Sequence, residues 1–126
     1  MASRLLRALP LLLLLLLAVA ARAAGHSLLV RSRPGRGATV ARAPERVQLW
    51  FSERIEPAYA TLSVRSHAGT QVDAGDAAVD PGDPTLLSVT TPTLGPGRYT
   101  ARFRVLSVDG HVVESSFAFT VKAAAR

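Results

Sequence analysis

Hydrophobic and polar side chains alternate along most of this chain after residue 45, and this period of two constrains the fold more than any other feature. A period of two places every second side chain on the same face of a β-strand, so each alternating segment is predicted to form a strand with one buried face. The predicted strands are residues 27–31, 46–52, 60–66, 85–91, 98–107 and 115–122.

Proline and glycine separate these strands. Pairs such as Pro34-Gly35 and the run Gly95-Pro96-Gly97 are typical of turns, and no segment of ten or more residues has a helical period. This spacing predicts an all-β Greek-key barrel or sandwich, immunoglobulin-like or cupredoxin-like, with a marginal strand at residues 77–79. The predicted core is Val47, Leu49, Phe51, Leu62, Val64, Leu87, Val89, Tyr99, Phe103, Val105, Phe117, Phe119 and Val121.

The first 25 residues have the organisation of a secretory signal peptide. Arg4 and Arg7 precede an apolar run over residues 11–17, and small residues follow it. The apolar stretch is short for a bilayer and contains Pro10, which favours a cleaved signal over a membrane anchor. We therefore expect export to the periplasm or the extracellular space, with no transmembrane segment in the mature domain.

The cleavage position decides which residue becomes the amino terminus. Cleavage after Gly25 gives a signal of residues 1–25 and a mature domain of residues 26–126 that begins with His26. The rival cleavage, after Ala23, would leave the nitrogen of His26 inside a peptide bond. We predict the first of these two positions.

Charge and cysteine content exclude several functions. The chain has no cysteine, which excludes a disulfide framework, a lipid-modified cysteine and thiolate metal ligands. Its formal charge of +6 falls to +3 without the signal, since Arg4, Arg7 and Arg22 leave with it and no acidic residue does. The remaining arginines are scattered and are not interleaved with aromatic residues, so we expect no nucleic-acid binding.

Two segments carry residues suited to metal binding, His26 and Asp109-Gly110-His111. An amino-terminal histidine offers its amine and a ring nitrogen to one ion. The amine yields its proton to a metal readily, because its pKa is about 8 against about 10.4 for a lysine. Imidazole and carboxylate ligands without thiolates suit Cu(II) ahead of zinc. The alternative is that Asp109-Gly110-His111 is only a turn; His67 is expected to lie in a surface turn.

A resemblance to a known family extends over nearly all of the mature domain. The residues that carry it are 26–29 (HSLL), 47–53 (VQLWFSE), 107–111 (SVDGH) and 117–121 (FAFTV). They resemble the CopC family of small exported copper-binding proteins, which serve bacterial copper resistance and homeostasis. The resemblance implies a Greek-key domain that holds one Cu(II) ion through His26, Asp109 and His111, with Glu53 close to the copper.

The same resemblance has further implications. Glu53 is expected to orient a ligand imidazole or the amino terminus, although it is also the polar end of a strand. A membrane copper transporter of the CopD type is the implied partner. The only methionine, Met1, leaves with the signal, so we expect no thioether Cu(I) site of the kind that some family members have.

Three functions remain open at this point. The first is a carrier or buffer of Cu(II), the second a copper redox enzyme of the monooxygenase kind, and the third a metal-free immunoglobulin-like interaction module. The small mature domain leaves little surface for a polymeric substrate, and Asp109 as a ligand would occupy a position that oxygen needs. The carrier is favoured, and no enzymatic activity is expected.

Overall fold

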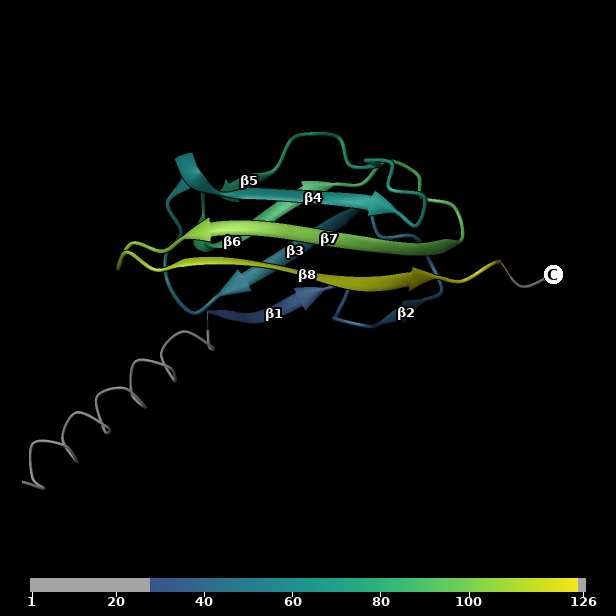
Figure 1. Ribbon diagram of the computed structural model, residues 1–126, viewed down its shortest axis with the longest axis horizontal. Coiled ribbons are helices and arrows are strands. Elements are labelled where there is room, and N and C mark those ends of the chain that lie inside the picture. The colour runs from purple at the N-terminus through teal and green to yellow at the C-terminus, as the bar shows by residue number, and fades with distance from the viewer. Residues whose placement is uncertain (1–27, 125–126) are drawn as a thin grey trace, which may run out of the picture.

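The computed structural model describes residues 28–124, which form a sandwich of two four-stranded β-sheets (Figure 1). The first sheet has the order β1 (Leu29–Arg33), β3 (Arg46–Phe51), β6 (Asp83–Thr90), β5 (Ala78–Asp80). The second has the order β2 (Thr39–Val40), β8 (Val112–Val121), β7 (Gly97–Leu106), β4 (Thr61–Ser66). Neighbouring strands are antiparallel except for β2 and β8.

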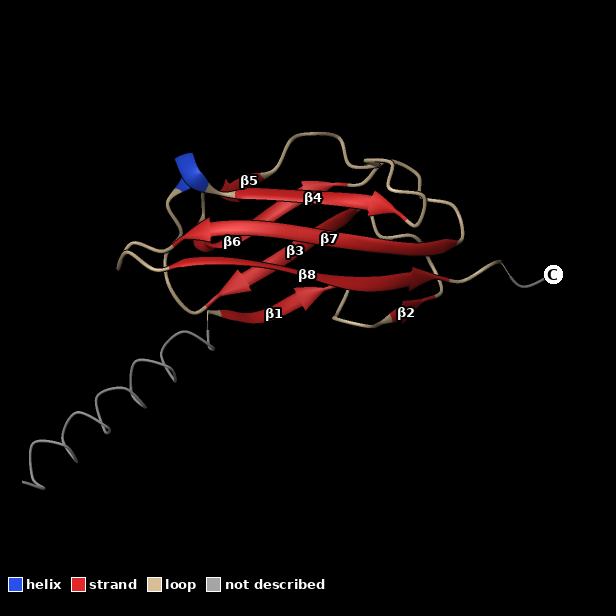
Figure 2. Ribbon diagram, in the orientation of Figure 1, coloured by secondary structure: helices blue, strands red, loops and turns tan. Residues whose placement is uncertain are grey.

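Strands dominate the regular structure, as Figure 2 shows. Apart from the strands, the described residues contain one turn of 3-10 helix, η1 (Pro57–Tyr59). None of the described helical structure is long and apolar enough to cross a membrane. The predicted signal, residues 1–25, lies outside the described residues, as does His26.

The order of the strands is that of an immunoglobulin-like sandwich. In that fold the first, second, fifth and fourth strands form one sheet, and the remaining strands form the other. Here β1, β3, β6 and β5 take those positions, opposite β8, β7 and β4. Tyr99 at the start of β7 donates its hydroxyl proton to the carbonyl oxygen of Gly95 at 2.6 Å, the tyrosine corner of such sandwiches. The all-β sandwich prediction is confirmed.

The six predicted strands all form, with bounds that shift by at most three residues. The marginal strand expected at residues 77–79 forms as β5, one residue later. The sequence analysis did not predict β2, which pairs only Thr39 with Thr120 and Val40 with Val121. Two residues are too few to show an alternation, so this strand leaves no periodic signal.

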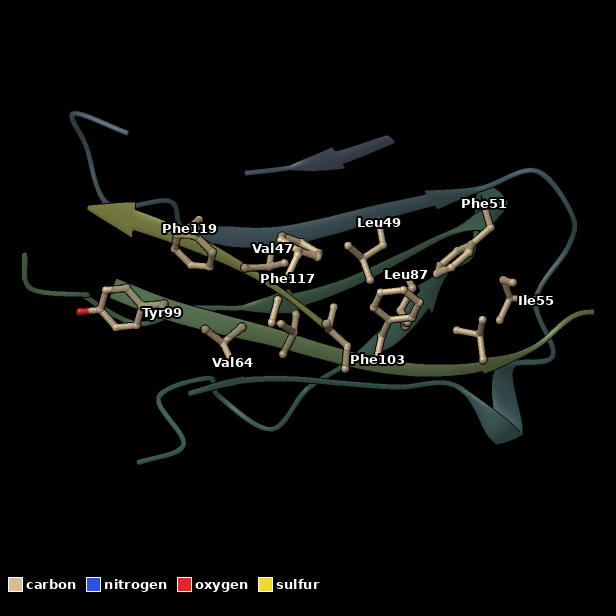
Figure 3. Close-up of a cluster of buried hydrophobic side chains, with 14 of the residues drawn as sticks. Val47, Leu49, Phe51, Ile55, Val64, Leu87, Tyr99, Phe103, Phe117 and Phe119 are labelled. Atoms are coloured by element: carbon tan, nitrogen blue, oxygen red, sulfur yellow. The ribbon is translucent and has the colours of Figure 1, made fainter. Parts of the chain in front are cut away.

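Side chains from both sheets meet in a single core (Figure 3). Phe51 packs edge-on against Phe103 across the two sheets, with ring centroids 5.6 Å apart. Every residue of the predicted core is buried. Leu28, Ile55 and Leu94 are also buried but were not predicted to be, because they lie outside or at the very start of the alternating segments. Since residues 28–124 form this core among themselves, we expect the domain to fold without the signal.

Candidate metal site

The loop that joins β7 to β8 carries two of the candidate ligands, Asp109 and His111. This loop, residues 107–111, is closed by two backbone hydrogen bonds. The amide of Ser107 donates to the carbonyl of His111 at 2.9 Å, and the amide of Gly110 donates to the carbonyl of Ser107 at 3.0 Å. Gly110 has a φ of +93°, a conformation that a side chain would strain. The loop is therefore a defined turn.

Asp109 and His111 face each other within this turn. The Oδ1 atom of Asp109 lies 2.9 Å from Nδ1 of His111. The same oxygen accepts a hydrogen bond from the hydroxyl of Ser107, which also lies 3.3 Å from the backbone nitrogen of His111. Within the described part of the chain, Nε2 of His111 and Oδ2 of Asp109 have no such partner. These two atoms remain available to an ion.

The two candidate ligands are open to solvent, whereas the residue that supports them is not. The side chains of His111 and Asp109 are 60% and 46% exposed, and Ser107 is 1% exposed. A buried hydroxyl thus supports a carboxylate and an imidazole at the surface. An ion or a partner protein can reach both of these groups without any rearrangement of the core.

The contacts of Asp109 hold it in the charged form. The hydrogen bond from Ser107, and after it the contacts with His111, together lower the pKa of the Asp109 carboxyl from 3.8 to about 2. A carboxyl with this pKa is ionised throughout the neutral range. Asp109 can therefore bind a cation without first releasing a proton.

A second loop makes backbone hydrogen bonds both to the β7–β8 turn and to the start of β1. This loop, residues 52–56, follows β3. The amide of Val108 donates to the carbonyl of Arg54 at 3.0 Å, and the amide of Ser52 donates to the carbonyl of Leu28 at 2.6 Å. The start of β1, this loop and the β7–β8 turn consequently lie at one end of the sandwich, at the left in Figure 1.

The structure places the remaining predicted site residues as follows. Glu53 is exposed in the loop of residues 52–56 and makes no hydrogen bond or ion pair with any described residue. His26 lies outside the described residues, two positions before Leu28. Within residues 28–124 no three side chains of metal-binding type come together, so the described part of the site consists of Asp109 and His111.

His67 lies at the opposite end of the sandwich. It follows β4, whose last residue, Ser66, pairs with Tyr99 at the start of β7. Thr61, at the start of β4, pairs with Arg104 near the end of β7, from which the chain enters the turn that holds Asp109. The length of β4 therefore separates His67 from the candidate ligands.

Ser107 is a site residue to which the sequence analysis gave no role. Its hydroxyl fixes Asp109, and it is buried beside Ile55 of the neighbouring loop, with which it forms an isolated β-bridge. The serine two residues before the aspartate was visible in the sequence. Its burial was not visible, because Ile55 belongs to no alternating segment.

We expect Ser107→Ala to raise the pKa of Asp109 toward 3.8 and to weaken Cu(II) binding by about tenfold. The substitution removes the hydrogen bond that stabilises the carboxylate and fixes its position. An NMR titration of the Asp109 carboxyl and a copper competition titration measure the two effects. Ser63→Ala on β4 is the control, and an unchanged Asp109 midpoint in Ser107→Ala would contradict the supporting role.

Comparison with known proteins gives a consistent result. The family model of the CopC domain matches residues 29–122. The solved structure of CopC from Methylosinus trichosporium is 38% identical, with a TM-score of 0.73, and the match covers 80% of this chain and 98% of that one. PcoC, a methionine-rich copper resistance protein from Escherichia coli, is 31% identical, with a TM-score of 0.64 and coverage of 77% and 99%.

A curated relative agrees with the solved structures. Copper resistance protein C of Xanthomonas campestris pv. juglandis is 33% identical over 108 residues, a match that covers 81% of this chain and 84% of the relative. The match therefore covers most of each of these three relatives.

Proposed function

Because the chain belongs to the CopC family, we propose that it is an exported protein that binds one Cu(II) ion and carries or buffers it in copper resistance or homeostasis. The ligands that we assign are the amine and ring of His26, the carboxylate of Asp109 and the ring of His111. We assign no enzymatic activity. The proposed location is the periplasm or the extracellular space, after cleavage of residues 1–25.

One observation carries this proposal. The hydrogen bonds of the loop over residues 52–56 bring the start of β1 to the end of the sandwich that presents Asp109 and His111. In a chain that begins at His26, the free amine is only two residues before Leu28, which lies at this end of the sandwich. The three proposed ligands then need no rearrangement of the sheets to meet at one ion.

The chemistry of the donors supports copper in its oxidised state. An amine, imidazoles and a carboxylate suit Cu(II), whereas Cu(I) prefers thiolate and thioether ligands. The full chain has no cysteine, and its only methionine, Met1, belongs to the predicted signal. The mature chain would therefore have neither ligand. The ionised Asp109 also offsets part of the charge of the ion.

Each side chain has a distinct role in this proposal. Oδ1 of Asp109 fixes the ring of His111 through Nδ1, which leaves Nε2 of His111 and Oδ2 of Asp109 for the ion. Glu53, on the adjoining loop, orients the amino terminus or the ring of His26. The exposure of Asp109 and His111 suits a carrier, because a membrane copper transporter of the CopD type can approach the ion directly.

The test is a Cu(II) titration of the protein that begins at His26, followed by electron paramagnetic resonance. We expect one equivalent to bind, with the spectrum of a tetragonal site of nitrogen and oxygen ligands. If the protein bound no copper, it would instead be a metal-free interaction module. Turnover of a substrate in the presence of a reductant would instead indicate a redox enzyme, and either result would contradict the proposal.

A further inference from the structure

Arginines that are scattered in the sequence gather on the outer face of the sheet formed by β2, β8, β7 and β4. In Figure 1 this sheet lies in front of β3 and β6. The exposed side chains of β7 alternate with its buried ones, and Arg98, Arg102 and Arg104 are among the exposed residues. Arg65 on β4 is exposed too and pairs with Thr100, between Arg98 and Arg102. We call Arg65, Arg98, Arg102 and Arg104 the arginine face.

The charge of the arginine face is largely uncompensated. On the described strands of this sheet the only acidic residue is Glu114, 4.0 Å from Nε of Arg104. Both side chains of this pair are more than half exposed, so their attraction is weak. Arg65 donates to the carbonyl of Gly69. Arg98 and Arg102 have no hydrogen bond or ion pair with any described residue, and both guanidinium groups are available.

The arginines are spread over a wide face, which suits a partner with an extended surface better than a nucleic acid. Side chains two residues apart on one face of a strand lie about 7 Å from each other, so Arg98 and Arg104 are separated by about 20 Å. The outward residues between them are mainly serine and threonine, with no aromatic side chain on which a base would stack.

Part of each edge of the sheet is already paired. Along β4, the amide of Val72 donates to the carbonyl of Val64 at 2.9 Å, and Asp73 accepts a hydrogen bond from the amide of Val64 at 2.8 Å. Along the last part of β8, the outer edge is paired with β2. An extended peptide could therefore add only along the first part of β8, away from most of the arginine face.

We propose that the arginine face docks the protein on a bilayer surface that contains anionic phospholipids. A guanidinium group binds a phosphate oxygen pair through two parallel hydrogen bonds, and the neighbouring hydroxyls of Ser63, Thr100 and Ser116 add donors. The face presents polar side chains, so the attraction is electrostatic and depends on salt. Asp109 and His111 lie in the turn beyond Arg104 and stay exposed. This docking does not depend on copper.

The experiment is a flotation assay with metal-free protein that begins at His26. One set of vesicles is phosphatidylcholine alone, and the other contains phosphatidylglycerol as well. We expect binding only to the anionic vesicles at low salt, and release at high salt. The double variant Arg98→Glu/Arg102→Glu should bind these vesicles at least about tenfold more weakly. Glu114→Gln should bind them more tightly, since it removes the acid from the face.

The control is Arg33→Glu/Arg46→Glu, which changes the net charge equally. These two arginines are exposed on the sheet opposite the arginine face, where Arg33 on β1 pairs with Gln48 and Arg46 on β3 pairs with Thr90. Circular dichroism checks that each variant is folded. Absence of vesicle binding, an equal loss in the two double variants, or binding to soluble polyglutamate in place of vesicles would each overturn the proposal. The last result would indicate an acidic protein partner instead.

Discussion

Replacing His111 by alanine in the protein that begins at His26 should weaken Cu(II) binding by a hundredfold or more. Loss of a supporting partner costs a metal site about 10–100-fold, and the loss of a ligand should exceed that range. The fold should persist, because the His111 side chain is 60% exposed and its backbone hydrogen bond to Ser107 remains. A competition titration against a chelator measures the affinity, and thermal unfolding checks the fold.

His67→Ala is the matched control for this prediction. This substitution also removes an imidazole, but from a turn at the other end of the sandwich. We expect its copper affinity to equal that of the parent protein. If His111→Ala also bound copper as tightly as the parent, the loop over residues 107–111 would be only a turn.

A single residue added before His26 should lower the affinity for Cu(II) by a comparable factor. In a protein that begins at Gly25, the nitrogen of His26 belongs to a peptide bond. An amide nitrogen gives up its proton far less readily than an amine, so the chelate formed by the amine and the ring is lost. The same titration measures the change, with paramagnetic resonance to follow the ligand set.

The control for this prediction is one extra residue after Arg126, which leaves the amino terminus free. We expect this extension to have no effect on copper binding. Equal affinity of the proteins that begin at Gly25 and at His26 would show that the amine is not a ligand. Amino-terminal sequencing of the exported protein then decides whether the natural cleavage leaves His26 first.

The fold could be predicted from the sequence because apolar and polar residues alternate along most of its strands. On β7, exposed polar residues alternate with buried apolar ones such as Tyr99 and Phe103. This alternation predicts that Arg98, Arg102 and Arg104 point outward. Leu94 carries no such signal, since it is buried within a loop rich in proline and glycine. Its burial depends on where the chain passes between the sheets, which no local pattern specifies.

The candidate site was visible only in part. The spacing of Asp109 and His111 favours a contact between them, and the structure shows it. The position of Glu53 near the turn depends on the hydrogen bond that the carbonyl of Arg54 accepts from the amide of Val108. Backbone groups are the same in every residue, so side-chain identity does not specify these long-range pairings. The position of Arg65 opposite Thr100, between Arg98 and Arg102, likewise depends on the register of β4 against β7.

Anomalous X-ray diffraction from the copper-loaded protein that begins at His26 tests the ligand assignment most directly. We expect one copper peak at the end of the sandwich that holds the β7–β8 turn. The amine and a ring nitrogen of His26 and a ring nitrogen of His111 should lie about 2 Å from the ion, as for other imidazole ligands, with the carboxylate of Asp109 beside it. A copper peak away from His111, or one without His26, would contradict the assignment.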